Sequence, residues 1–584
     1  MSQAFKKVLV ANRGEIAMRI FRACHDLGLQ TIAIYSNEDV YSLFRTAADE
    51  SYLIGENESP LGAYLDIPRI IELAKKHGAD AIHPGYGFLS ENADFARACE
   101  AAGIKFIGPS SQVLDLMGDK LSAKQIAVAC GVPTTPGTTE PLKSREAAQK
   151  LAMEFGFPVI LKAAAGGGGR GMRRCDTVEE VGTNFDLVKA EAKKAFGNDD
   201  IFMEKFLVEP KHIEVQVLGD EEGNVVHLFE RDCSLQRRYQ KVVEFSPAFS
   251  VDKKIRQALY EDAVKIAKHV GYVNAGTLEF LVDREGHHYF IEMNPRIQVE
   301  HTVTEMVTGV DLVRSQILIA EGCPLSDPRI GIRKQSDLHL NGYAIQCRVT
   351  TEDPSNNFAP DTGKITSSPV CRRSRPAGRG HRRRGQRDLP YYDSLLLKVT
   401  TWDNTFQGVC LKAGRAIREI HIRGVKTNIA FISNILQNPT FLAGGCHTKF
   451  IDETPELFEL NEGQDRATKM LKYIGNIVVK ERDGHKMYDP CRFPPVTGNR
   501  PDGLKQMLDA KGPKAVADWV LGQKKLLICD TTCRDAHQSL LATRVRTRDI
   551  VKGMEGTSEI LADAFSLECW GGATFDVAYR FLHE

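Results

Sequence analysis

The sequence predicts a multidomain protein that combines α/β and α+β architecture. Its 584 residues exceed what a single hydrophobic core supports, so three or more domains are expected. In about the first 110 residues, short apolar runs alternate with segments of helical periodicity, which is typical of a parallel sheet covered by helices. From about 115 to 330, paired strand-like runs stand between helices, and this pattern predicts a mixed sheet.

The N-terminal elements follow from the order of the apolar runs. Strands are expected at KVLVA, QTIAIY, ADAIHP and IKFIG, which occupy 7–11, 30–35, 79–84 and 104–108. Helices are expected between them at 15–28, 67–78 and 92–103, each ending at a glycine. A third mixed segment follows at 335–455, then a mostly helical stretch to about 522 and a new apolar strand from 525.

Composition favours a soluble globular protein with free thiols. Lysine plus arginine and aspartate plus glutamate both number 76, so the formal net charge is zero. No apolar run approaches the ~18 residues that a membrane span requires, and the N-terminus has the pattern of strand, turn and helix rather than of a targeting peptide. The 14 cysteines include no CxxC pair. We therefore expect a cytoplasmic protein in a reducing compartment, without a membrane partner.

A glycine tract follows a lysine in FPVILKAAAGGGGRGM, at 157–172. Glycines allow backbone N–H groups to approach phosphate oxygens closely, and Lys162 would add a point charge. A flexible linker is the alternative interpretation. Because the tract joins a strand-like run without Ser or Pro spacers, we favour a phosphate-binding loop.

GTLEFLVDREGHHYFIEMNPR, at 276–296, predicts a hairpin whose turn is DREG. A turn centred between Glu285 and Gly286 places Glu279 opposite Glu292, and Asn294 lies on the same face as Glu292. Three oxygen ligands on one face suit Mg²⁺ or Mn²⁺. The alternative is a hairpin that carries ordinary acids on a solvated face.

Two further polar segments are candidates for chemistry. In RIQVEH, at 296–301, Arg296 could clamp an oxyanion and Glu300 could act as a general base, although a structural ion pair is the alternative. DCSLQRRYQK, at 232–241, concentrates Gln236, two arginines and Lys241 after a strand, as a second anion site or as a solvated loop.

The order of these motifs resembles the biotin carboxylases of the ATP-grasp superfamily. The resemblance runs from about residue 5 to 455 and is carried by ANRGEIAMRI, HPGYGFLSEN, LMGDK, GGGGRGM, MEKFL, RDCSLQRR, QKVVE, IEMNPRIQVEHTVTE and QCRV. Downstream, TTCRDAHQSLLATRVRT and SLECWGGATFD resemble the start of the carboxyltransferase barrel in the pyruvate carboxylase family.

The resemblance implies five regions. They are a Rossmann-like pre-ATP-grasp domain at 1–116, an ATP-grasp domain at 117–330 with a mobile lid at about 135–204, a mixed C-terminal biotin carboxylase domain at 331–455, a helical linker or allosteric-type region at 456–522, and an incomplete TIM-barrel fragment at 523–584. Because the chain ends after two barrel strands, we expect a truncated protein competent at most for the first half-reaction, with the biotin carrier domain acting in trans.

The implied reaction phosphorylates bicarbonate with ATP and passes the carboxyl group to biotin. Residues implied to hold the nucleotide are Lys120, Lys162, Gly168, Gly169, Glu204, Lys205, Leu207, His212 and Gln236. The implied metal ligands for Mg²⁺ or Mn²⁺ are Glu279, Glu292 and Asn294. Bicarbonate would meet Lys241, Arg296 and the Val299 backbone, with Glu300 as its base. Arg348 would stabilise the biotin enolate, and Tyr86 and Gly87 would face the biotin ring.

Three departures from the family pattern matter. Tyr239 replaces the histidine of QRRHQK at the nucleotide site, so ATP affinity is expected to fall. Cys533 replaces the phenylalanine of TTFRD, whereas Arg534, Asp535 and Gln538 match the start of the pyruvate site. The third departure is the end of the chain after two barrel strands. Asp535 alone should not hold a metal without the rest of the barrel.

A separate feature is an arginine run, CRRSRPAGRGHRRRGQR at 371–387. It suggests an RNA-binding protein as a distant alternative, but the rest of the chain is mildly acidic and the run has no aromatic residue, so no nucleic-acid partner is expected. The family has a Gly-rich β segment here near its dimer contact. We interpret 371–389 as a compensated frameshift, which resequencing would test and which puts homo-oligomerisation in doubt. The closest functional alternative is the biotin carboxylase component of an acetyl-CoA or propionyl-CoA carboxylase.

Overall fold

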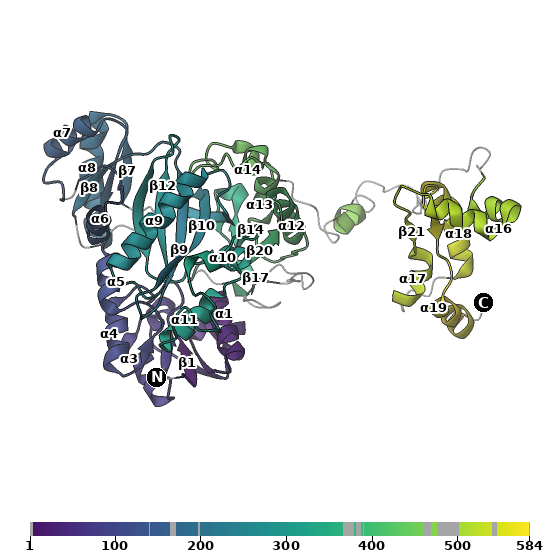
Figure 1. Cartoon of the computed structure of the whole chain (residues 1–584), viewed down its shortest axis with the longest axis horizontal. Coiled ribbons are helices and arrows are strands. Elements are labelled where there is room, and N and C mark those ends of the chain that lie inside the picture. Colours follow the sequence, from purple (N-terminus) through teal and green to yellow (C-terminus); the bar gives the residue numbers. More distant parts are fainter. Residues whose placement is uncertain are drawn as a thin grey trace. The chain divides into compact units, whose positions relative to one another are not determined.

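A computed structural model describes residues 4–138, 140–163, 171–196, 199–365, 379–380, 387–388, 391–460, 469–475, 502–539 and 546–582 (Figure 1). The chain divides into two compact units, Met1–Gly463 and Gln464–Glu584. Among the residues described, no helix is both long and apolar enough to cross a membrane.

The N-terminal sheet has five parallel strands in the order β3-β2-β1-β4-β5. Its strands are β1 (Lys7–Val10), β2 (Gln30–Tyr35), β3 (Glu50–Leu53), β4 (Ala81–His83) and β5 (Lys105–Phe106). Helices α1 (Gly14–Asp26), α3 (Ile67–Lys76) and α4 (Ala93–Ala101) lie at the predicted positions. The parallel sheet is therefore confirmed. Sequence inspection missed β3, because its four residues are all half-buried and include no apolar run.

The central sheet has eight strands in the order β13-β12-β9-β10-β11-β14-β20-β18. Its main strands are β9 (Lys211–Gly219), β10 (Val225–Arg237), β11 (Gln240–Ser246), β12 (Asn274–Val282), β13 (His288–Asn294), β14 (Tyr343–Thr350) and β20 (Leu395–Asp403). Alternation along β9 separates two faces. Ile213, Val215 and Val217 join the apolar core that includes helix α9 (Lys253–His269), whereas Glu214 and Gln216 face the opposite way and contact Arg231.

In the sequence between β5 and β9, the chain forms a smaller three-stranded sheet in the order β7-β6-β8. Its strands are β6 (Val159–Ala163), β7 (Met172–Cys175) and β8 (Ile201–Lys205), and helices α7 (Arg145–Phe155) and α8 (Val178–Phe196) complete a separate apolar core. In Figure 1 this group lies at one end of the first unit. It corresponds to the predicted lid segment, and its movement remains a prediction.

The third predicted segment packs around β14 and β20. Helices α12 (Phe406–Arg418), α13 (Ile429–Gln437) and α14 (Pro439–Leu442) share one core with these strands. Most of the arginine run lies outside the described residues. Only the short strands β18 (Arg379–Gly380), which pairs with β20, and β19 (Arg387–Asp388), which pairs with β17 (Gly363–Lys364), belong to the described part.

The second unit contains few strands. Helices α16 (Leu504–Leu521), α17 (Thr532–Ser539) and α18 (Thr547–Ile560) accompany a two-stranded parallel sheet of β21 (Cys529–Asp530) and β22 (Ser566–Leu567). The two predicted strands are therefore present but only two residues long in the described part. Their assignment to a TIM barrel remains a prediction.

Candidate active site

The predicted acidic hairpin brings its three predicted metal ligands, Glu279, Glu292 and Asn294, close together. Glu279 of β12 pairs directly with Glu292 of β13, as predicted, and a register irregularity follows immediately after Glu279. The Asn294 side-chain amide donates to Glu279 Oε1 at 2.8 Å. His212 Nε2 lies 2.9 Å from the other oxygen of Glu279, and Lys120 Nζ lies 3.7 Å from Glu292.

The two carboxyl groups have opposite electrostatic environments. Burial alone would raise the pKa of Glu279, but Lys241 and His212 hold it well below its usual range. Burial and the charge of Glu279 raise the pKa of Glu292. The protein cations therefore compensate one carboxylate better than the other, and a divalent cation would relieve the repulsion between them.

Lys241 is the centre of the buried cluster. Its ammonium group donates to Glu214 Oε1, to Glu279 Oε1 at 3.1 Å and to Glu300 Oε1 at 2.7 Å, while its side chain is only 13% exposed. Burial lowers the pKa of Lys241, but Glu279 and Glu300 outweigh that effect and raise it. One lysine thus touches three carboxylates from different elements.

Glu300 stands at the N-terminus of α10 (His301–Thr308) and also contacts Arg348. Arg348 donates from Nη2 to Glu300 Oε2 at 3.0 Å and from Nε to the buried Glu244. Burial would raise the pKa of Glu300, but Lys241 and Arg348 hold it far below its usual range. Glu300 is therefore ionised at neutral pH.

Arg296 does not pair with Glu300, which corrects the alternative interpretation of RIQVEH as one ion pair. Arg296 lies in the turn after β13, where its Nε is 3.2 Å from Glu91 and its Nη2 donates to Asn294 Oδ1 at 2.9 Å. Glu300 instead contacts Lys241 of β11 and Arg348 of β14. The two residues therefore have different partners although only three residues separate them in the sequence.

The nucleotide-binding candidates gather on β6 and β8. Lys162 Nζ donates to Glu204 Oε2 at 2.5 Å, and Lys124 donates to the other oxygen at 3.2 Å. Although burial opposes it, this pair of lysines lowers the pKa of Glu204 to about 2. The Lys205 ammonium instead binds the carbonyls of Gly156 and Phe157, and Leu207 follows the end of β8.

The remaining nucleotide candidates divide into two groups. Gln236 donates to His212 Nδ1 at 2.8 Å, so these two predicted residues are in contact. Gly168 and Gly169 lie outside the described residues.

The predicted loop at 232–241 is a tight hairpin, which corrects that interpretation. Strand β10 continues to Arg237 and β11 begins at Gln240, so only Arg238 and Tyr239 form the turn, both with positive φ. The strands pair from Asp232 opposite Phe245 to Arg237 opposite Gln240, with register irregularities on both sides of Leu235. Tyr239 is 58% exposed at the turn, and its predicted contact with the nucleotide remains a prediction.

Tyr86, predicted to face biotin, and Val299, predicted to meet bicarbonate through its backbone, are both held by side chains to which sequence reasoning assigned no role. The Tyr86 hydroxyl donates to Glu15, and the Val299 carbonyl accepts a hydrogen bond from Lys398 at 2.8 Å. Gly87 adopts a φ of 70°, and a Cβ there would meet no atom within 4 Å.

Sequence reasoning also missed Glu214, Arg231 and Glu244. All three are fully buried charged residues in strands of the central sheet. Charged residues that alternate with apolar ones, as in HIEVQV, were a usable signal. The same pattern also describes an ordinary solvated strand, so it did not identify a site.

In the second unit, the pyruvate-site candidates form a small polar group. Arg534 contacts Asp535 at 2.8 Å and Glu568 at 2.9 Å. Gln538 lies in the same helix, α17. No group of three or more potential metal ligands includes Asp535 among the residues described in this unit.

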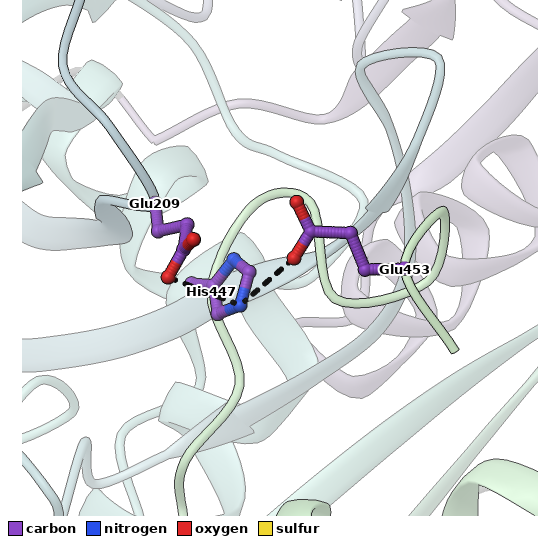
Figure 2. Close-up of side chains that lie close together, drawn as sticks. All are labelled: Glu209, His447 and Glu453. Atoms are coloured by element: carbon purple, nitrogen blue, oxygen red, sulfur yellow. Dashed lines mark ion pairs between the residues drawn. The ribbon is translucent and has the colours of Figure 1, made fainter.

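A second ligand-like cluster lies outside this site, where His447 stands between Glu209 and Glu453 (Figure 2). His447 Nε2 is 3.8 Å from Glu209 and 3.6 Å from Glu453. Its Nδ1 accepts the Lys449 backbone N–H, so the Nε2 of the neutral ring carries the proton. Arg284 also binds Glu209. Nδ1 is thus already occupied as an acceptor, and the protonated Nε2 faces the two carboxylates at distances longer than a hydrogen bond, so this arrangement does not favour a metal site.

Comparison with known proteins places this geometry in a family. Three family models match: Biotin carboxylase, N-terminal domain, at 4–114, Carbamoyl-phosphate synthase L chain, ATP binding domain, at 119–327, and Biotin carboxylase C-terminal domain at 346–453. The biotin carboxylase domain of Hydrogenobacter thermophilus 2-oxoglutarate carboxylase is 48% identical, with a TM-score of 0.75 over 79% of this chain and 100% of that one. The chain belongs to the biotin carboxylase family.

Other biotin carboxylases give the same result. A crystal structure of the biotin carboxylase subunit of pyruvate carboxylase is 50% identical, with a TM-score of 0.68 over 79% of this chain and all of that one. Pyruvate carboxylase from Bacillus subtilis is 52% identical over 100% of this chain and 51% of its own length. This biotin carboxylase therefore spans about half the length of the curated relatives it matches.

Proposed function

We propose that this biotin carboxylase uses ATP and bicarbonate to carboxylate biotin through carboxyphosphate, as the first half-reaction of a pyruvate carboxylase. The observation that carries the proposal is the buried cluster in which Lys241 contacts Glu214, Glu279 and Glu300. Such a cluster concentrates both charges that phosphoryl transfer needs: carboxylates for a divalent cation and cations for an anionic substrate. The related Hydrogenobacter domain was solved with MgADP and bicarbonate.

The oxygen-rich hairpin suits a magnesium ion. Glu279, Glu292 and Asn294 would hold it, since they offer hard oxygen ligands and since burial and the neighbouring charge of Glu279 both raise the pKa of Glu292. When bound, the ion would neutralise charge on the ATP phosphates. Asn294 Oδ1 accepts one hydrogen bond from Arg296 and has a second lone pair that could bind the ion, while its Nδ2 donates to Glu279.

In this proposal Glu300 takes the proton of bicarbonate. Its carboxylate accepts that proton while a bicarbonate oxygen attacks the γ-phosphorus of ATP and ADP leaves. A low pKa makes a weak base, but an anion that draws Lys241 away from Glu300 would raise the pKa of Glu300 as the substrate binds. Binding and activation of the base would thus be coupled.

Pyruvate is the proposed final acceptor, with biotin delivered by a carrier domain. Support comes from the relatives that match over the whole chain, which are pyruvate carboxylases. An acetyl-CoA or propionyl-CoA carboxylase component is the weaker alternative, because 523–584 resembles a carboxyltransferase barrel of the pyruvate type. A cytoplasmic location, the oligomeric state and the absence of a nucleic-acid partner stay predictions.

Bicarbonate-dependent ADP release with free biotin as acceptor tests this function. We expect Arg296→Ala and Glu300→Gln each to lower the rate by about 100-fold or more, since each removes a group that binds or activates bicarbonate. Matched controls are Arg69→Ala and Glu72→Gln, which break an exposed ion pair on α3 and should change the rate less than about twofold. Equal rates in wild type, Arg296→Ala and Glu300→Gln would refute the assigned roles.

A further inference from the structure

Lys398 is a buried lysine in the middle of β20. Its side chain is 1% exposed, and its Nζ lies 2.8 Å from both the Val299 carbonyl oxygen and Glu15 Oε1. Lysines are almost never fully buried unless paired, because removing an ammonium group from water is costly. The contacts that repay this cost join three segments distant in sequence: α1, the turn before α10, and β20.

Glu15 connects the lysine to Tyr86. Glu15 lies in the first turn of α1 with a side chain 3% exposed, and the oxygen that meets Lys398 also accepts the Tyr86 hydroxyl. The backbone carbonyl of Tyr86 accepts from Asn12 at 2.8 Å. Both the backbone and the ring of Tyr86 are therefore fixed, and the ring lies 5.8 Å from the Lys398 ammonium.

Val299 connects the same lysine to the proposed base. It directly precedes Glu300, so a bond to the Val299 carbonyl restrains the backbone that carries that carboxylate. Lys398 also stands directly opposite Arg348 in the β14–β20 ladder, and Arg348 is the second partner of Glu300. Lys398 therefore lies next to both the backbone that carries Glu300 and Arg348, which pairs with its carboxylate.

We infer that Lys398 and Glu15 are positioning residues that fix the Val299–Glu300 turn relative to Tyr86. This inference rests on the proposed function. In that reaction the bicarbonate base and the ring facing biotin must keep a set separation, since misplacement by about 1 Å costs about 100-fold in rate. Neither residue touches substrate in this scheme. Their contribution is geometric, because the pair joins helix α1 to strand β20.

The variants preserve side-chain shape as far as possible. In the full chain, Lys398→Met removes the ammonium, Glu15→Gln removes the charge, and Tyr86→Phe removes only the hydroxyl. Lys412→Met is the matched control, because this half-exposed lysine on α12 pairs with Asp403 at the surface. Thermal unfolding of each variant establishes that it is folded.

Kinetics give the first readout. Lys398→Met should raise the KM values for both bicarbonate and biotin about tenfold, equivalent to about 1.4 kcal/mol each, with the KM for ATP unchanged. Tyr86→Phe should raise only the KM for biotin. In a Lys398→Met background, Tyr86→Phe should raise the KM for biotin little further, because both substitutions break the same hydrogen-bond network. Unaltered KM values for bicarbonate and biotin in folded Lys398→Met and Glu15→Gln would overturn the inference.

Amide hydrogen exchange gives a readout independent of activity. In Lys398→Met, exchange should accelerate at 297–302 and at 84–88, with β9 and β12 unchanged. A purely structural ion pair would instead accelerate exchange throughout the unit, and that outcome also overturns the inference. If Lys398→Met does not fold, Glu15→Gln and Tyr86→Phe carry the test. Wild type without bicarbonate-dependent ADP release would refute the proposed function but leave the exchange result interpretable.

Discussion

Single residues in this protein are tuned mainly by what surrounds them in the fold. Glu204 illustrates this, because two lysines that are distant in sequence, Lys124 and Lys162, converge on its two oxygens. Its side chain is only 17% exposed, so solvent screens the pairs weakly. At the proposed nucleotide site, an incoming phosphate would compete with Glu204 for Lys162.

Glu204→Gln should destabilise the protein in a pH-dependent way. The folded pKa of about 2 is below the ordinary value of 4.5, so the ionised form contributes stability that is fully present above about pH 4.5 and is lost as pH falls toward 2. We expect a loss on the order of 2 kcal/mol at pH 7. Denaturant unfolding of wild type and Glu204→Gln at pH 7 and pH 3.5 measures this loss. An equal difference in the free energy of unfolding at the two pH values would contradict the assignment.

At the scale of elements, hairpins and bridging segments bring the site residues into contact. The β12–β13 hairpin aligns Glu279 with Glu292, and the segment before α7 pairs along β8 through Gly137 and Glu204. This second pairing needs glycine, because a Cβ at Gly137 would lie 2.6 Å from the Met203 carbonyl oxygen and 2.8 Å from Glu204 Cγ.

Gly137→Ala should therefore displace β8 and disturb the Glu204–Lys162 pair. We expect the KM for ATP to rise about tenfold, with a smaller change in kcat, because the strand carries groups proposed to meet the nucleotide. Steady-state kinetics at varied ATP give the answer. Gly553→Ala in α18 is the control, since its added Cβ meets no atom within 4 Å. An unchanged KM for ATP would show that this bridge does not position the nucleotide site.

At the scale of the whole molecule, every hydrophobic core cluster found among the described residues lies in the first unit. The second unit exposes large apolar side chains, among them Leu521, Leu526 and Trp570. A unit with its own cores can fold independently of a neighbour. The solved biotin carboxylase subunit that matches 79% of this chain corresponds to one such piece.

A fragment of residues 1–463 should keep the proposed activity. Bicarbonate-dependent ADP release is expected within about twofold of the full chain, because all groups of the candidate biotin carboxylase site belong to this unit. Calorimetry should show cooperative unfolding of the fragment. A fragment that fails to fold, or one that loses more than tenfold in rate, would mean that 464–584 supports the site.

The parallel N-terminal sheet, the acidic hairpin and its register could be predicted from the sequence, because strand periodicity and turn residues act over a few positions. The tertiary structure alone decided the partners of the charged residues. These contacts place Lys241 among three carboxylates, Arg296 beside Glu91, and Lys398 between Val299 and Glu15, and each of them joins segments far apart in the chain. A buried charge is stable only where the fold supplies its partner, and no local pattern records which distant residue that is.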